Sequence, residues 1–290
     1  MKSPRPFPRV TVTPKAQASC EGGHPWIYDT EIVRTDGEPE NGALVDVLSP
    51  RGGYLGTGWI SRHSKIRVRL ITRLASELTA DSPAVLTAFW ERRIRRAWDY
   101  RRAVMAEDVN ACRLIFGEAD GFPGLTVDRF EHVLVAQTLS CGMERMKPIV
   151  FPLLLQILRE DWQRVDAIYE RNDAAIRDRE GLPQGKGWFG GEGGEPSLLL
   201  TENGIHYRVD FENGQKTGFF LDQKYNRRAV ARLAAGRRVL DCFTHTGSFA
   251  LNAAAAGAAH VTAVDISEEA VRLAAENARL NGLDAAVDCR

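Results

Sequence analysis

Hydrophobic and polar residues alternate along short stretches within the first 74 residues. β-Branched residues and leucine recur at every second position at Val10 and Val12, at Val45 and Val47, and at Ile66, Val68 and Leu70. This period of two is typical of strands that bury one face. A Pro-Arg-Gly-Gly turn at residues 50–53 joins two of these stretches. The pattern predicts a small closed β-barrel over residues 1–74.

Between residues 75 and 195 the hydrophobic period becomes mixed. A helix is expected to begin near Pro83, because proline suits the first turn of a helix. Its apolar face recurs at helical spacing and comprises Leu86, Trp90, Ile94, Ala97, Trp98, Val104 and Met105. Strand-like segments follow at 113–116, 125–130 and 133–139, then an apolar helix at 149–158 and a strand at 167–170. The mixture predicts a central α+β domain.

The third pattern covers residues 196–290. It follows a stretch, 181–196, that holds seven glycines among its sixteen residues and is expected to be a flexible loop. Beyond it, Asn203-Gly204 is the pair that a type I′ hairpin turn favours. After a helix at 222–234, two β-prone runs end in Asp241 and Asp265, and a helix follows each of them. This β-α-β-α order predicts the start of a doubly wound, Rossmann-like sheet, so the chain combines α/β and α+β parts.

The strand, turn and helix around Asp241 are typical of a nucleotide cofactor site. Such a turn brings main-chain N–H groups and a helix N-terminus to a ligand. Asp265, 18 positions after Gly247, can accept hydrogen bonds from both hydroxyls of a ribose. Phe243 and His245 replace two glycines of the dinucleotide fingerprint, which disfavours NAD and favours S-adenosylmethionine, a cofactor without phosphates. The alternatives are a nicotinamide dehydrogenase and an ordinary strand-turn-helix.

Composition narrows the class of protein. The 290 residues are 44% hydrophobic, which is sufficient for folded cores, and no apolar run reaches the length of a membrane span. The first nine residues are proline-rich and basic, unlike a secretory signal. Five cysteines, an odd number without a Cys-x-x-Cys pair, indicate reduced thiols in the cytoplasm and argue against a disulfide framework and a metal site.

Charge is unevenly distributed although the net charge is zero. Residues 51–102 hold twelve Lys or Arg against four Asp or Glu. Such a basic region indicates a surface that binds the phosphates of nucleic acid. The candidate RNA contacts are Arg51, Lys65, Arg67, Arg92, Arg95, Arg96 and Arg102. Four of these arginines are expected on the polar face of the helix near Pro83; the alternative is a solvated face on which Glu91 pairs with Arg95.

Five ordered segments carry a family resemblance. They are residues 23–28 (GHPWIY), 113–125 (RLIFGEADGFPGL), 169–173 (YERND), 217–228 (TGFFLDQKYNRR) and 241–249 (DCFTHTGSF). Together they resemble the class I S-adenosylmethionine-dependent RNA methyltransferases, and more closely the subfamily with a PUA domain that makes 5-methylcytosine in 23S ribosomal RNA. The resemblance runs from about residue 9 to the last residue.

The resemblance implies a cofactor, a partner and site residues. The cofactor is S-adenosylmethionine and the partner is ribosomal RNA, read in part by a PUA domain at residues 1–74; an SH3-like barrel without an RNA role is the alternative for that domain. Whether the protein forms a homodimer is left open by the resemblance. The implied cofactor residues are Gln223 and Arg227 at the methionine end, Asp241, Phe243, Thr246, Gly247 and Ser248 in the turn, and Asp265 at the ribose. Lys224 stands where many relatives have arginine.

The resemblance also implies catalytic groups. In this family a cysteine thiolate adds to carbon 6 of the cytosine, and this cysteine and an Asp-Pro-Pro type motif follow the second β-α unit. No residue of this sequence matches either, so we expect the nucleophilic cysteine beyond Arg290, in a C-terminally truncated chain that is inactive alone. Cys242 is expected to pack beneath the turn as a small buried thiol, and Cys289 also to be structural. The rival hypothesis is a catalytically empty RNA-binding protein of the same descent.

Overall fold

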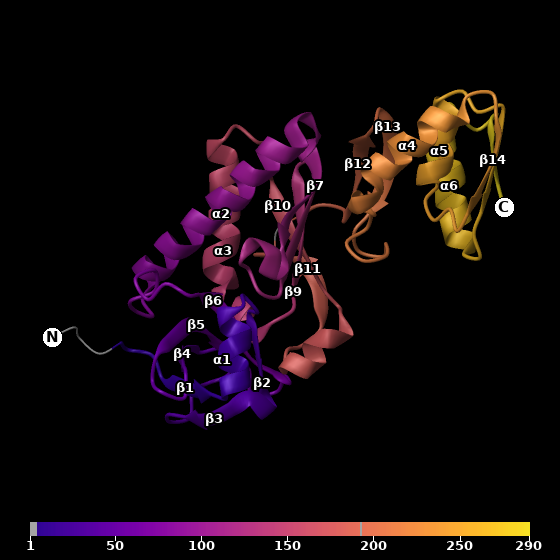
Figure 1. The fold of residues 1–290 in the computed structure, drawn as a ribbon. Coiled ribbons are helices and arrows are strands. Elements are labelled where there is room, and N and C mark those ends of the chain that lie inside the picture. The colour runs from indigo at the N-terminus through magenta and orange to yellow at the C-terminus, as the bar shows by residue number, and fades with distance from the viewer. Residues whose placement is uncertain (1–4, 192) are drawn as a thin grey trace. The chain divides into compact units, whose positions relative to one another are not determined.

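The structure, a computed structural model, describes residues 5–191 and 193–290 (Figure 1). Its contacts divide the chain into two compact units. Unit 1 comprises residues 1–106, 114–128 and 132–192, and unit 2 comprises residues 107–113, 129–131 and 193–290. Every helix among the described residues is too short or too polar to cross a membrane.

Unit 1 begins with a curled sheet of six strands in the order β2-β6-β5-β4-β1-β3. The strands are β1 (Arg9–Val12), β2 (Trp26–Tyr28), β3 (Ile32–Thr35), β4 (Leu44–Leu48), β5 (Tyr54–Ile60) and β6 (Ile66–Thr72), with helix α1 (Pro14–Glu21) after β1. The alternating residues of the sequence pattern, except the half-buried Ile66, face one core, in which Val10, Val12, Val47 and Val68 are completely buried. The period of two therefore predicted the buried face of this sheet.

The remainder of unit 1 combines two long helices with a second sheet. Helix α2 (Pro83–Met105) packs against α3 (Cys141–Glu160). The sheet has the order β11-β10-β9-β8-β7. Its strands are β7 (Ala111–Phe116), β8 (Leu125–Phe130), β9 (Val133–Thr138), β10 (Ala167–Asn172) and β11 (Gly185–Trp188). Leu86, Trp90, Ile94, Ala97 and Trp98 of α2 are buried as expected, whereas Val104 is 55% exposed because it lies in the last turn of α2.

Strand β11 corrects the expectation of a flexible loop at 181–196. Residues Gly185–Trp188 pair antiparallel with β10, and the ring of Trp188 lies edge-on to that of Tyr169 at 5.2 Å. One aromatic contact and a main-chain ladder thus order part of a glycine-rich segment. Helix α3 is also longer than the expected 149–158, because Ser140 caps it by accepting a hydrogen bond from the Met143 N–H.

Unit 2 places a hairpin before a small parallel sheet. Strands β12 (Ser197–Glu202) and β13 (Ile205–Asp210) meet at Asn203 and Gly204, which both have positive φ, as a type I′ turn requires. The sheet order is β14-β15-β16, all parallel. The elements are α4 (Lys224–Ala234), β14 (Arg238–Cys242), α5 (Ser248–Ala255), β15 (His260–Val264), α6 (Glu268–Leu280) and β16 (Val287–Cys289). The three helices lie on one side of β14 (Figure 1).

Candidate cofactor-binding site

The turn between β14 and α5, residues 241–248, has an unusual backbone. Phe243 and His245 adopt left-handed conformations, with φ of 61° and 52°, and Gly247 follows with φ of 81° as the N-cap of α5. The left-handed region costs an L residue about 1–2 kcal/mol, and such strain gathers at functional sites. The Thr244 N–H donates to the Val264 carbonyl at 2.9 Å, which anchors the turn to β15.

Asp241 holds the turn and the start of α5 together. Its Oδ2 accepts hydrogen bonds from the Thr244 hydroxyl at 2.6 Å and from the Ala250 N–H at 3.1 Å. An acidic group in this place also interacts favourably with the N-terminus of α5. Burial raises the pKa of Asp241, and the two donors oppose that shift. Asp241 is therefore a structural anchor of the turn.

Asp265 is the residue best placed to meet a ligand. Its Oδ2 accepts the His245 N–H at 2.9 Å and its Oδ1 accepts the Ser267 N–H at 3.0 Å. Burial alone would raise the pKa of Asp265, but these main-chain donors lower it. An ionised carboxylate has about four acceptor positions, so each oxygen keeps capacity for a further donor. Ile266, the next residue, is 98% exposed and offers an apolar surface beside the carboxylate.

Thr246, Gly247 and Ser248 pack the turn against its helices. The Thr246 carbonyl accepts from Asn277 Nδ2 at 3.0 Å, and a Cβ on Gly247 would lie 3.1 Å from that of Ala274. Ser248 is buried, whereas Phe243 is 85% exposed. The buried Thr246 hydroxyl has no partner among the described residues. An orphaned hydroxyl and the spare acceptors of Asp265 both fit a polar ligand such as S-adenosylmethionine.

Arg227, expected at the methionine end of the cofactor, is a buried residue. Its side chain is 1% exposed and pairs with the buried Glu202, Nη1 to Oε1 at 2.6 Å. Its Nη2 donates to the Phe220 carbonyl at 2.8 Å, and the Phe220 ring lies edge-on to His245 at 5.2 Å. Arg227 therefore supports the turn through Phe220, whose ring contacts His245. Gln223 is half-buried, and its side chain bonds with Asp222 and Asn226.

Sequence reasoning missed Glu202, although a signal was present. Leu198, Leu200 and Glu202 share one face of β12, and all three are buried. An acid at the inward position of an alternating strand indicates a buried partner, because an isolated charge in a core is costly. That partner is Arg227.

The candidate RNA residues do not form one group. Arg51 and Lys65 are exposed, and Arg67 is half-buried with its Nη1 donating to the Ser61 carbonyl at 2.7 Å. Arg95 pairs with Glu91 at 2.8 Å and with Glu160 at 2.7 Å. Arg102 pairs with Asp99 at 2.7 Å and with Asp161 at 3.1 Å. The pair of Glu91 with Arg95 agrees with the alternative of a solvated face, and acids at the end of α3 also pair with Arg95 and Arg102.

Cys242 also differs from expectation. It is exposed rather than buried, because side chains alternate along β14 and the face of Cys242 is also that of Leu240, which is 64% exposed. Cys20, Cys112 and Cys141 are buried. Among residues 5–191 and 193–290, no cluster of histidine, cysteine and acidic side chains could hold a metal ion.

Arg290 extends the pairing of β16 with β15 and helps to place Asp265. Its N–H donates to the Ala263 carbonyl at 2.9 Å, and its carbonyl accepts the Asp265 N–H at 3.1 Å. Its guanidinium pairs with Asp288 at 2.6 Å. Burial raises the pKa of the thiol of Cys289, the residue before it. The main chain at Arg290 is therefore an integral part of the small sheet that carries the site.

Comparison with known proteins matches both ends of the chain. The family of PUA-like domains matches residues 10–73, and that of S-adenosylmethionine-dependent methyltransferases matches residues 173–288. Ribosomal RNA large subunit methyltransferase I of Klebsiella pneumoniae (strain 342) is 38% identical over 279 residues, covering 96% of this chain and 67% of that protein. The chain belongs to this methyltransferase family. The protein of the same name from Shewanella amazonensis is 40% identical over 277 residues, with coverage of 95% and 67%.

Solved structures agree on the fold. A Streptococcus mutans protein assigned to the S-adenosylmethionine-dependent methyltransferases has a TM-score of 0.76 at 22% identity, covering 97% of this chain and 69% of that one. A methyltransferase structure solved with SAH has a TM-score of 0.78 at 22% identity, covering 97% and 68%. These structures confirm the predicted fold class, and the family matches confirm the cofactor class.

One expectation from the sequence is not supported by the comparisons. It held that the chain is truncated and inactive and that its nucleophilic cysteine lies beyond Arg290. The Klebsiella pneumoniae relative aligns with 96% of this chain, and the methyltransferase family match reaches residue 288, two positions before Arg290. That expectation rested on motifs that were not found, and a missing match gives no information about activity; the chain spans 67% of the length of the Klebsiella pneumoniae relative.

Proposed function

We propose that this protein transfers the methyl group of S-adenosylmethionine to carbon 5 of a cytosine in large-subunit ribosomal RNA. The observation that carries the proposal is the Asp265 carboxylate, held by two main-chain donors with acceptor capacity to spare, beside a strained turn at a helix N-terminus. Membership of the ribosomal RNA methyltransferase family supports the substrate class. Such an enzyme acts in the cytoplasm, where ribosomes assemble.

Each residue of the site has a distinct part in this proposal. Asp265 accepts the ribose hydroxyls of the cofactor, and Ile266 packs against its adenine. The main chain of the turn, together with Gln223, faces the methionine end, while Asp241 and Arg227 position the turn. When bound, the cofactor supplies an electrophilic methyl group. In the proposed division, residues 1–74 bind RNA, 75–195 form a central domain and 196–290 bind the cofactor.

Methyl transfer is tested with tritium-labelled S-adenosylmethionine and ribosomal RNA that lacks the modification. The expected product is labelled 5-methylcytidine after digestion to nucleosides. Label in another nucleoside would contradict the assignment to cytosine, while the assignment as an RNA methyltransferase would still hold. Cofactor and RNA binding without any transfer would instead support the rival hypothesis, a catalytically empty RNA-binding protein.

A further inference from the structure

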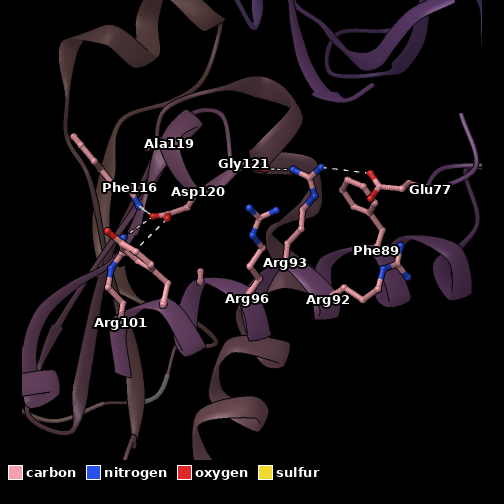
Figure 2. Close-up of a pocket in the computed structure, with 12 residues that line it drawn as sticks. Glu77, Phe89, Arg92, Arg93, Arg96, Arg101, Phe116, Ala119, Asp120 and Gly121 are labelled. Atoms are coloured by element: carbon pink, nitrogen blue, oxygen red, sulfur yellow. Dashed lines mark hydrogen bonds and ion pairs between the residues drawn. The ribbon is translucent and has the colours of Figure 1, made fainter. Parts of the chain in front are cut away.

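A pocket of about 670 Å³ lies beside α2 in unit 1 and is distinct from the cofactor turn (Figure 2). This volume lies within the usual range of ligand sites. Its lining includes four arginines from α2, at positions 92, 93, 96 and 101, against two acids, Glu77 and Asp120. The lining therefore carries a net charge of +2, which favours an anionic ligand.

Two of the four arginines hold the pocket walls. Arg101 Nη2 contacts Asp120 at 2.6 Å, and the same carboxylate accepts the Phe116 N–H at 2.7 Å. Arg93 donates to the Gly121 carbonyl at 2.7 Å and lies 3.7 Å from Glu77. Burial lowers the pKa of Arg93, Glu77 opposes this, and the nearby charges of Arg96 and Arg92 lower it further.

The other two arginines are available to a ligand. Arg92 and Arg96 are exposed and one helical turn apart, and no ion pair or hydrogen bond of their side chains is present among the described residues. Figure 2 shows the Arg96 guanidinium directed toward the loop of Asp120 and Gly121 without a partner. A planar guanidinium without an acid partner suits phosphate oxygens, which it can bind with two donors.

Two aromatic rings border the same pocket. Tyr100, one turn beyond Arg96, is 57% exposed, and Phe116 at the end of β7 is 56% exposed. Large exposed aromatic side chains beside basic groups are the usual platform for unstacked bases of single-stranded nucleic acid. Both features of a nucleotide, its phosphate and its base, thus have a matching surface here.

The pocket continues toward the N-terminal sheet. A second cavity of about 560 Å³ shares Glu77, Arg93 and Ala119 with the first and extends to Gly23, Pro25 and Arg73. Two adjoining cavities offer room for several linked nucleotides, which favours a strand over a single nucleotide.

We infer that the α2 pocket binds a single-stranded segment of the RNA substrate, with Arg92 and Arg96 on its phosphates and Tyr100 and Phe116 against its bases. The inference rests on the proposed function, because it names the RNA-contacting surface of that methyltransferase. It differs from the contacts expected from sequence, since Arg95 and Arg102 have no part in it.

The test uses a fluorescein-labelled 12-nucleotide RNA of mixed sequence and fluorescence anisotropy. The double variant R92Q/R96Q is compared with R95Q/R102Q, which removes the same charge from the same helix. R92Q/R96Q should weaken binding about tenfold or more and reduce the salt slope of log Kd by about 1.4, as expected for two single-strand phosphate contacts. R95Q/R102Q should change Kd less than about twofold, because its side chains are already paired with acids.

The base contacts are tested by Tyr100→Ala, with Trp162→Ala as its control, since Trp162 is 94% exposed and does not line the pocket. Tyr100→Ala should weaken binding about tenfold, and Trp162→Ala should have no effect. Equal effects of both members of either pair, or no RNA binding by the unaltered protein, would overturn the inference. Competition by inorganic phosphate or AMP as effective as by the 12-nucleotide RNA would assign the pocket to a free anion. Equally tight binding of a 12-base-pair duplex would also contradict it.

Failure of this inference and failure of the proposed function give different results. Equilibrium dialysis with S-adenosylmethionine should give the same Kd for R92Q/R96Q and the unaltered protein, since the cofactor residues are untouched. If RNA binding depends on Arg92 and Arg96 but no methyl transfer occurs, the pocket inference is supported and the proposed methyltransferase function is rejected. Methyl transfer with unchanged RNA affinity in R92Q/R96Q would do the reverse.

Discussion

In the 241–248 turn the groups that fix the site are mainly main-chain donors, whereas in the α2 pocket they are long side chains from separate segments. Asp265 accepts two N–H groups from residues 2 and 20 positions away. In the pocket, Arg93 reaches Gly121 across 28 positions and Arg101 reaches Asp120 across 19. The first site follows the order of strand, turn and helix along the chain, and the second depends on how long side chains pack between elements.

The buried Arg227–Glu202 pair is the exception within the cofactor site, and breaking it should have the largest effect. Glu202→Ala leaves the Arg227 guanidinium buried without its acid, which typically costs about 3–5 kcal/mol. The free energy of unfolding, measured by urea denaturation followed by circular dichroism, should fall by that amount. Loss of the pair should also weaken cofactor binding, because Arg227 holds Phe220 against His245.

Two further variants sharpen this prediction. Glu276→Ala removes one of the two acidic partners of Arg272 on α6, the other being Glu269, and should leave the unfolding midpoint unchanged. Replacing both Glu202 and Arg227 by methionine should recover much of the lost stability, because no charge then remains buried. A cost for Glu202→Ala as small as that of Glu276→Ala would show that the pair does not support the turn.

Asp265→Asn should have the next largest effect, on ligand binding. The amide keeps one acceptor oxygen but loses the charge, and hydrogen bonds to charged groups contribute about 1.5–3 kcal/mol each. The Kd for S-adenosylmethionine, measured by isothermal titration calorimetry, should rise at least about tenfold. Asp284→Asn, an exposed acid of the same unit, is the matched control. Equal affinities of the two variants would remove Asp265 from the site.

The strand, turn and helix around Asp241 could be predicted from sequence, and the partners of the α2 arginines only in part. Asp241, Gly247 and Asp265 occupy fixed places in a strand-turn-helix, so their order along the chain determines their proximity. Arg92 and Arg96 lie roughly 90° around α2 from Arg95 and Arg102 at 3.6 residues per turn. Glu91 and Asp99, at helical spacing within α2, already indicate partners for Arg95 and Arg102. Glu160 and Asp161 add a second partner to each from outside the helix, which no pattern within α2 contains.

The segments 141–160 and 185–188 show the same limit of prediction from sequence. The apolar core of α3 was apparent, but its N-terminal turns depend on the Ser140 cap and on Gly142, where a Cβ would lie 1.9 Å from the Trp59 ring. Strand β11 depends on pairing with β10. Both features come from contacts between segments distant in sequence, which periodicity does not register.

Gly121→Ala tests the side-chain construction of the α2 pocket against a matched glycine. Gly121 and Gly52 have almost the same φ, 79° and 81°, but only at Gly121 would a Cβ meet another group, Arg93 Nη1 at 2.4 Å. Both variants should lose about 1–2 kcal/mol of unfolding free energy from the left-handed backbone. Gly121→Ala should also weaken binding of the 12-nucleotide RNA, since Arg93 must move. Unchanged RNA binding would show that the pocket tolerates displacement of Arg93.

The smallest effects concern pH, and they should have opposite signs at Asp241 and Asp265. The ordinary pKa of both is 3.8; burial raises that of Asp241, and the main-chain donors lower that of Asp265 against the effect of burial. Asp265 therefore stabilises the fold above pH 3.8, and this contribution is lost as the pH falls through its lower folded-state pKa. The contribution of Asp241 is present below pH 3.8 and is lost as the pH rises through its higher folded-state pKa.

Relative to the unaltered protein, Asp265→Asn should thus become more destabilising with rising pH and Asp241→Asn less so, as followed by urea midpoints. Carbon-detected NMR titration of the two carboxyl groups checks the assignment, and pKa values on the same side of 3.8 would contradict it, because the main chain would then not distinguish the two acids.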